Sequence, residues 1–272
     1  MKKLLLLILV AGLFTKCKTH NQQTADGNKQ LASLLQTYFN DRMQLFPLEA
    51  TVNGDNRFNN LLPIDFTDSY RSKLKDFFTK NQQDLKIINR DSLNDNDKIS
   101  YDIFSYEMDI TLAGLVQHYL VNNTFMPFDQ FNGVPIMLGQ MGGGTGNQPF
   151  KTVADYDKWL QRAEAFSPWA DSAIVYFKKG MANNYVLPKT LVVKMIPELT
   201  AMVKDSAAGS LFYGTVNLMP SNFSQADKIR LTAAYTSLIE TKFNTRIQAV
   251  GQFFTERLYT KGTRNYRSKC IA

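Results

Sequence analysis

The chain has 272 residues, of which 31 are Lys or Arg and 24 are Asp or Glu, so its formal net charge is +7. A hydrophobic share of 44% and a charged share of 20% are typical of a globular protein and exclude a disordered or collagen-like chain. Two His and two Cys are too few for a four-ligand Cys/His zinc site beside a His-dependent catalytic triad.

The N-terminus has the pattern of an export signal. Lys2 and Lys3 precede an apolar run of eleven residues over 4–14. As a helix this run would rise only about 16 Å, roughly half of the hydrocarbon core of a bilayer, which is too short for a membrane span. We therefore predict a signal peptide over residues 1–16.

Cys17 follows the apolar run closely and resembles the cysteine of a bacterial lipoprotein signal, whose thiol takes a diacylglyceryl group. Lys16 stands where that signal normally has a small residue, so simple secretion with an incidental Cys17, or a retained apolar anchor, stays open. We predict lipidation of Cys17, a polar tether over residues 17–28, and a lipid-anchored location in the cell envelope, at the outer membrane or in the periplasm. The lipid would make the membrane a partner.

From residue 29 onward the apolar residues recur at three- and four-residue spacing, which is typical of helices buried on one face. This period predicts a helix that stops at Pro47 and further helices over residues 66–88 and 97–120. In the last of these we expect the core-facing residues to be Ile99, Ile103, Tyr106, Ile110 and Leu115.

Residues 122–150 are rich in Asn, Gly, Pro and Phe, a composition that predicts one long irregular loop. Helical spacing resumes at Asp155, and Gly180 is a plausible C-cap of the helix that Pro168 opens. Pro188 opens another helix. Ser224 and Asp227 resemble a capping box before a last apolar stripe that runs to Leu258. Strand patterns are scarce, so we predict an all-α fold of long antiparallel helices over residues 29–260.

Few residues point to chemistry. The glycine-rich run 138–146 lacks the Lys and the Ser/Thr of a phosphate-binding loop, which favours a flexible turn. Asp102 and Asp109 share one helix face and could hold a hard cation, but without further acids converging on them a solvated face is the favoured explanation. His118 stands alone on a helix, as a packed or surface histidine does.

The aromatic residues of the predicted loop are harder to assign to a core. Phe128 and Phe131 flank Gln130, Asn132 and Gly133. Apolar rings with amides between them suit either a loop pinned to the fold or a groove that accepts peptide-like groups. Both readings stay open at this point.

Several short motifs together resemble one known family. Their order along the chain is Phe46–Gly54 (FPLEATVNG), Phe128–Pro135 (FDQFNGVP), Gln148–Phe150 (QPF), Asp155–Tyr156, Trp159–Arg162 (WLQR), Gly180 and Val186–Pro188 (VLP). Their order and spacing identify the chain as a member of the bacterial domain of unknown function 885 family. The resemblance runs from about residue 30 to about residue 260.

The resemblance implies a helical, exported or lipid-anchored protein related to zinc metallopeptidases. Members are typically twice as long, and a His-Glu followed by Gly-His-His in their second half would bind zinc and supply the catalytic Glu. That motif is absent here, so no residue of this chain matches a catalytic or metal-binding position, and zinc is implied only for full-length relatives. The resemblance places Gln130, Asn132 and Gly133 nearest the substrate channel, as one possible part of its wall.

The basic tail 261–272 contains Lys261, Arg264, Arg267 and Lys269 and no acid, and we do not expect it to belong to the fold. With the basic residues of both ends set aside, the remaining chain has 24 basic and 24 acidic residues, so the charge gives no support to a nucleic-acid partner. The abrupt loss of helical periodicity suggests a frameshift or premature stop near Thr260.

The leading hypothesis is therefore the non-catalytic N-terminal half of an exported zinc-metallopeptidase-like lipoprotein, truncated and inactive alone. The alternative is a stand-alone helical lipoprotein that binds peptides or an envelope partner. A third hypothesis is a complete enzyme that uses Asp102, Asp109 or His118, so whether the chain is an enzyme stays open.

Overall fold

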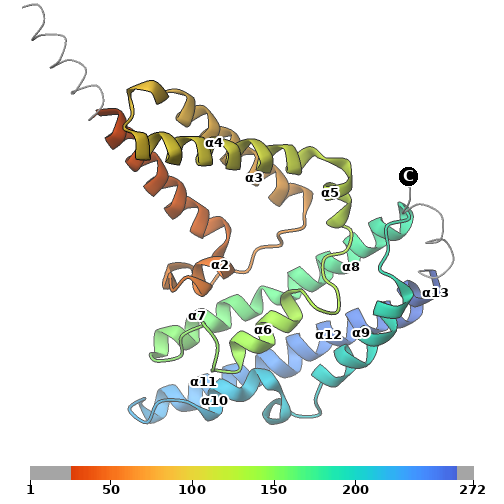
Figure 1. Cartoon of the computed structure of the whole chain (residues 1–272). Coiled ribbons are helices and arrows are strands. Elements are labelled where there is room, and N and C mark those ends of the chain that lie inside the picture. The colour runs from red at the N-terminus through yellow and green to blue at the C-terminus, as the bar shows by residue number, and fades with distance from the viewer. Residues whose placement is uncertain (1–25, 262–272) are drawn as a thin grey trace, which may run out of the picture. The chain divides into compact units, whose positions relative to one another are not determined.

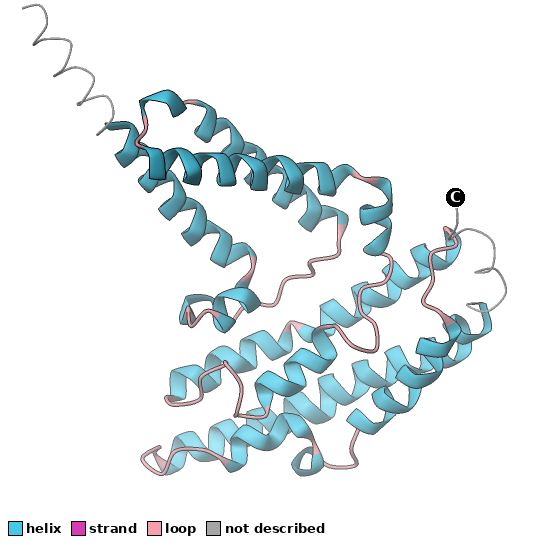
Figure 2. Ribbon diagram, viewed as in Figure 1, coloured by secondary structure: helices cyan, strands magenta, loops and turns pink. Residues whose placement is uncertain are grey.

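The structure is a computed structural model that describes residues 26–261, apart from the side chains of His118, Tyr119 and Lys261. Within this range it is built from helices joined by loops and contains no strand, which confirms the all-α prediction (Figure 2). The chain divides into two compact units. The described part of the first is 26–42 with 72–117, and that of the second is 43–71 with 118–261.

A helix over residues 26–45 opens the described chain (Figure 1). The first unit takes most of its other residues from α3 (Asp68–Lys86), η2 (Arg90–Ser92) and α4 (Asp95–Val116). The second unit contains α2 (Pro47–Val52), η1 (Asn56–Phe58), α5 (His118–Asn123), α6 (Val134–Gly142), α7 (Val153–Glu164), α8 (Phe166–Ala182), α9 (Lys189–Met202), η3 (Ala207–Gly209), η4 (Leu211–Tyr213), α10 (Gly214–Asn217), α11 (Gln225–Leu238), η5 (Ile239–Phe243), α12 (Asn244–Phe253), η6 (Phe254–Leu258) and α13 (Tyr259–Lys261).

Aromatic rings hold the first unit together. The ring of Tyr38 stacks on Phe77 with centroids 5.4 Å apart and meets the edge of Phe104 at 4.8 Å. The Tyr38 hydroxyl donates a hydrogen bond to Glu107 of α4. Because Phe104 is 3% exposed and Met108 is 0% exposed, these two residues mark the face of α4 that packs into the unit.

The expected core face of α4 is wrong. Ile99, Ile103, Tyr106 and Ile110 are 54–67% exposed, whereas only Leu115 of the five expected residues is half-buried. Helix α4 has apolar residues on two sides, and the side with Phe104 and Met108 is the one that meets the rings of the first unit. Spacing alone could not choose between two apolar stripes of the same period.

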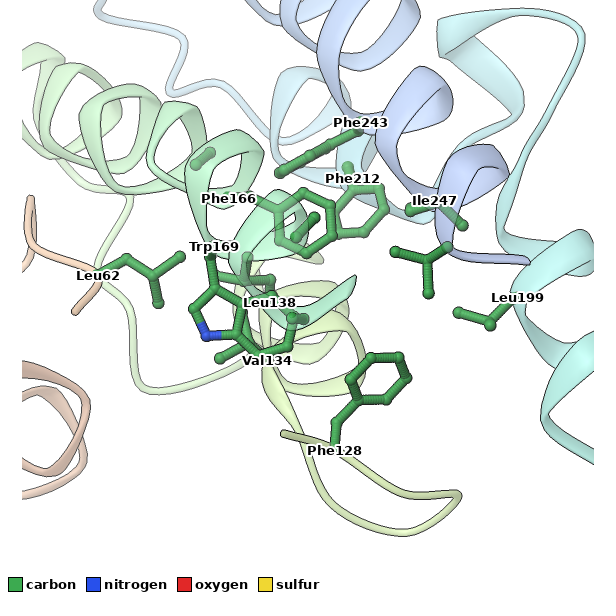
Figure 3. Close-up of a cluster of buried hydrophobic side chains, with 14 of the residues drawn as sticks. Leu62, Phe128, Val134, Leu138, Phe166, Trp169, Leu199, Phe212, Phe243 and Ile247 are labelled. Carbon is green, nitrogen blue, oxygen red and sulfur yellow. The ribbon is translucent and has the colours of Figure 1, made fainter. Parts of the chain in front are cut away.

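The second unit is built around a cluster of large apolar side chains (Figure 3). Trp169 of α8 stacks on Phe166 at 5.9 Å, and Phe166 meets the edge of Phe243 from η5 at 5.2 Å. Phe128, which lies on the turn below these rings in Figure 3, stacks on Phe254 at 5.4 Å. The core therefore draws together segments that are far apart in the sequence.

Several helix starts lie where the sequence predicts them. Ser224 accepts a hydrogen bond from the backbone N–H of Asp227 and caps α11, and Pro188 directly precedes α9. Pro168 lies in the first turn of α8, where the missing N–H costs no helical hydrogen bond. Thr152 and Asp155 form a full capping box at the start of α7.

The expected long loop is shorter than its composition suggests, because α6 occupies Val134–Gly142 and α5 overlaps its start. Gly142 lies in α6, although glycine is unfavourable in a helix. Its position is explained by packing, because a Cβ there would lie 2.6 Å from the ring of Trp159. Gly180 likewise lies inside α8 and is no C-cap. A Cβ on it would lie 2.4 Å from the carbonyl oxygen of Tyr185.

The predicted ends of the chain are only partly covered. Residues 26–28, which we expected in the tether, belong to the opening helix. The predicted signal segment 1–16, Cys17 and nearly all of the tail 261–272 lie outside the described residues. Among the described helices, none combines the length and the apolar character needed to cross a bilayer.

Candidate functional site at the Gln130 turn

The segment that the resemblance associates with a substrate channel forms a closed turn. The Asp129 carboxylate accepts hydrogen bonds from the backbone N–H groups of Phe131 at 2.7 Å and Asn132 at 2.9 Å. The backbone N–H of Asp129 donates to the carbonyl oxygen of Asn132 at 2.9 Å. These bonds fix residues 129–132, while buried Phe128 pins the turn to the core.

Gly133 joins this turn to α6. Its φ of 145° lies in a region that side chains rarely adopt, and a Cβ would come within 2.3 Å of the Phe128 Cβ. Only glycine lets the chain fold back over Phe128 at this point. The family resemblance placed Gly133 near a channel. The structure shows that the conformation of the turn requires glycine at this position.

The side chains of the turn differ in what they offer. Gln130 donates from Nε2 to Glu198 Oε1 of α9 at 2.8 Å, and its Oε1 is buried without a hydrogen-bond partner. Asn132 is exposed, and Phe131 is 72% exposed beside it. The turn thus brings Gln130, Asn132 and Gly133 together, with one amide oxygen unsatisfied and one aromatic ring uncovered.

A second polar cluster surrounds Arg162, which is 0% exposed. All five of its N–H groups have acceptors within 3.2 Å, and these acceptors are the carbonyl oxygens of Leu61, Pro47 and Phe58, the hydroxyl of Thr51 and the side-chain oxygen of Gln148. The Thr51 hydroxyl can donate in turn to Asn59 Oδ1 at 2.6 Å. No carboxylate takes part in these bonds.

In the Arg162 cluster, a buried positive charge is stabilised by hydrogen bonds to uncharged oxygen atoms. Burial lowers the pKa of Arg162 to about 10, so the side chain keeps its charge at neutral pH. The cluster ties α7 to residues 47–61, which lie about a hundred positions earlier in the chain. Because every N–H of Arg162 is used, the side chain has no donor left for a substrate.

The acidic residues considered as a cation site are solvated. Asp102 accepts two hydrogen bonds of 2.6 Å from Arg90, which lowers the pKa of its carboxyl, and Asp109 accepts one of 2.6 Å from Gln82. Both carboxylates are exposed on α4. Nowhere in residues 26–261 do three or more His, Cys, Asp or Glu side chains gather as metal ligands would, with the His118 side chain outside the description.

A shallow cleft of about 550 Å³ lies between α7 and the run formed by α11 and η5. Arg230 pairs with Asp157 at 2.7 Å, and Lys242 pairs with Glu164 at 3.2 Å. The charged side chains that line the cleft are therefore already paired, and they join α7 to α11 and η5.

The comparison with known proteins decides the family. Residues 47–269 match the family of bacterial proteins of unknown function called DUF885. The chain belongs to the DUF885 family. The resemblance found in the sequence is thereby confirmed at the family level, and no curated protein matches the chain.

One solved structure shares the DUF885 chain's fold. It is described as "the putative lipoprotein from Colwellia psychrerythraea", and it superposes with a TM-score of 0.68 at 16% sequence identity. The similarity covers 87% of this chain but only 42% of that chain. This DUF885 chain therefore spans less than half the length of its structural relative.

The motifs that carried the DUF885 resemblance have structural partners here. Phe46–Gly54 and Gln148 supply acceptors to Arg162, which ends the WLQR motif. Sequence reasoning quoted Arg162 but missed its role, because burial of an arginine without an acid cannot be read from spacing. The only sequence signal for the role of Arg162 was that Trp159 and Gln148 belong to the same set of motifs.

Proposed function

We propose that this chain is the helical, non-catalytic half of an exported, zinc-metallopeptidase-like lipoprotein, and that it is inactive alone. The observation that carries the proposal is that Arg162, Gly133 and Gly180, three residues of its DUF885 motifs, support the fold. Every N–H group of Arg162 donates a hydrogen bond to another group of the protein, and Gly133 and Gly180 allow close backbone packing.

The comparison of lengths supports a role as part of a larger protein. The similarity covers 42% of the structural relative, so a protein of that length has room for a second half that carries the chemistry. On this proposal the Gln130 turn contributes one wall of a substrate channel.

Hydrolysis by the purified chain tests the proposal. We expect no cleavage of a peptide library above the rate without protein, with or without added zinc. Hydrolysis that copurifies with the chain and that EDTA abolishes would overturn the proposal and favour a complete enzyme. A mock preparation from the same host controls for contaminating peptidases.

The proposed location rests on Cys17 and on the printed description of the structural relative as a lipoprotein. We propose that Cys17 carries a diacylglyceryl group and anchors the chain in the bacterial envelope. Replacement of Cys17 by Ser should abolish the incorporation of labelled palmitate and shift the protein from the detergent phase to the aqueous phase. Replacement of Cys270 by Ser should change neither result.

The proposal also predicts where the missing chemistry is encoded. A metal-binding half should be found when the DNA after codon 272 is read in all three frames, as a His-Glu followed by Gly-His-His. If the next thousand or so bases encode no such motif in any frame, truncation by a frameshift or stop is excluded. The non-catalytic role of this chain would still stand on the hydrolysis assay.

The alternative function is a stand-alone module that binds peptides. One observation favours it, which is that the turn holds both the unsatisfied Oε1 of Gln130 and the exposed ring of Phe131. In that case the full chain binds members of the peptide library saturably without turnover, and Gln130→Ala weakens binding. Gln140→Ala, on the exposed side of α6, is the matched control and should leave binding unchanged.

A further inference from the structure

Helix α4 carries an uncovered apolar face that the fold does not use. Ile99 is 59% exposed, Ile103 63%, Tyr106 67% and Ile110 54%. These four residues, called the α4 seam below, are separated by four, three and four positions. Phe104 and Met108, which pack into the first unit, lie on the other side of the helix.

The spacing of the α4 seam is that of a two-stranded coiled coil. Alternating steps of three and four residues keep apolar side chains in line toward a facing helix, and β-branched Ile at one of the two positions favours two strands. Ala113 continues the same line and is also exposed. From Ile99 to Ala113 the seam covers two heptads, or about 21 Å of helix.

Acidic side chains run along the edges of the seam. Asp95, Asp102 and Asp109 recur every seven residues on one edge, and Glu107 lies on the other. Lys98 is the one basic residue of α4 and pairs with Asp95 at 3.5 Å. Arg90 of η2 pairs with Asp102, and Arg42 contacts Tyr38, which donates a hydrogen bond to Glu107. Four acids therefore meet three bases. The edges therefore keep a net negative charge.

This charge selects among the possible occupants of the seam. A second copy would place acidic edges opposite acidic edges, which destabilises a coiled coil. An anionic membrane surface would repel the same edges, since interfacial helices carry Lys and Arg on their polar face. A helix with basic edges meets neither obstacle.

We propose that the α4 seam binds an amphipathic helix of a partner protein, with apolar residues at three- and four-residue spacing and Lys or Arg along both edges. Apolar side chains of the partner would cover Ile103, Tyr106 and Ile110, and its basic edges would face Asp109 and Glu107. The site lies in the first unit, whereas the Gln130 turn lies in the second, so the inference is independent of the proposed function.

A designed probe tests the proposal with the full chain. The probe is a fluorescent helical peptide of three heptads, about 21 residues, with Ile and Leu in the seam positions and Lys on the edges. One control peptide has Glu on the edges, and another has the first composition in scrambled order. We expect saturable binding of the Lys-edged peptide by anisotropy, weakened by salt, and about tenfold or more weaker binding of both controls.

Variants of the chain locate the binding. The double substitution Ile103→Ser with Ile110→Ser should raise the dissociation constant about tenfold or more, whereas Ile87→Ser with Ile229→Ser, at positions 80% and 62% exposed, should leave it unchanged. Asp109→Lys should weaken the Lys-edged peptide and strengthen the Glu-edged one. These residues are exposed, and circular dichroism checks that each variant keeps its helix content.

Three outcomes would overturn the proposal. The Lys-edged and scrambled peptides could bind equally, or the seam variant could bind like its control. The wild-type chain could be a dimer that the seam variant makes monomeric, which would assign the seam to a second copy. The Cys17→Ser chain could bind anionic vesicles in a way that the seam variant abolishes, which would assign the seam to a lipid surface.

Discussion

Arg162 sits in the interior of the second unit without an acid to balance its charge. Transfer of a guanidinium from water costs several kcal/mol unless its donors are satisfied, and here five oxygens satisfy all five N–H groups. The same oxygens depend on the arginine, since buried carbonyl groups also need partners. The cluster is therefore stable only as a whole.

Arg162→Met should lower the free energy of unfolding by about 3–5 kcal/mol, because it leaves buried acceptors without donors. Urea unfolding followed by tryptophan fluorescence measures the loss, since Trp159 and Trp169 both lie in the second unit. Arg246→Met removes an exposed ion pair with Asp171 and should cost less than about 1 kcal/mol. Equal losses in the two variants would contradict the structural role of Arg162.

Gly133→Ala should lower the free energy of unfolding by about 2–4 kcal/mol, since the new Cβ meets Phe128 and the backbone angle is unfavourable. Gly54→Ala separates the two causes. Gly54 has a φ of 80° with no atom within 4 Å of the added Cβ, so it should lose only about 1 kcal/mol. A loss at Gly133 no larger than at Gly54 would show that the contact with Phe128 is unimportant.

Sequence reasoning selected Gln130, Asn132 and Gly133 by family resemblance, and their place beside a substrate channel stays a prediction. The structure adds that Asp129 and Gly133 shape the turn, which any local turn pattern could suggest. The contact of Gly133 with Phe128 was not predictable, because it depends on the ring being anchored in a distant core.

At the scale of elements, several helix starts were predicted well, whereas the buried face of α4 was not. Caps such as Ser224 act within three or four residues, so their signal is local. The buried face of α4 depends on which neighbour supplies the facing rings, and the sequence offered two apolar stripes. Helix α6 was missed because a glycine-rich composition predicts a loop, whereas the glycines of α6 allow close packing inside a helix.

Phe104→Ala and Ile103→Ala test the orientation of α4 with neighbouring residues. Phe104→Ala should cost about 3–5 kcal/mol because it empties a packed site beside Tyr38. Ile103→Ala should change the free energy of unfolding by no more than about 0.5 kcal/mol, since Ile103 is exposed. Urea unfolding followed by far-ultraviolet circular dichroism measures the loss of helix in the chain. A larger loss of stability for Ile103→Ala than for Phe104→Ala would show that the opposite face of α4 is buried.

At the scale of the whole molecule, the response to pH depends on the titration of buried side chains and not on the net charge of +7. Burial, with a contribution from Asp155, raises the pKa of Tyr156 to about 12, and burial also raises the pKa values of Tyr38 and Tyr235. A free phenol ionises near pH 10. The folded state thus holds protons that the unfolded state releases.

The chain should therefore lose stability as the pH rises from about 10 to about 12. The buried tyrosines should ionise together with unfolding, as a late and steep rise of the tyrosinate absorbance. Arg162, whose pKa burial lowers to about 10, acts in the opposite direction but is one group against three. Tyr235→Phe should reduce the loss, whereas Tyr259→Phe, at a 38% exposed position, should leave it unchanged.

The Arg162 cluster also sets an order of events during synthesis and folding. Pro47, Phe58 and Leu61 emerge from the ribosome about a hundred residues before the guanidinium that binds their carbonyl oxygens. Contacts between such distant positions form late, because closing a long loop comes before any gain from the contact. The second unit therefore cannot complete its folding from the N-terminus onward, and the early segment stays open to chaperones until α7 has been made.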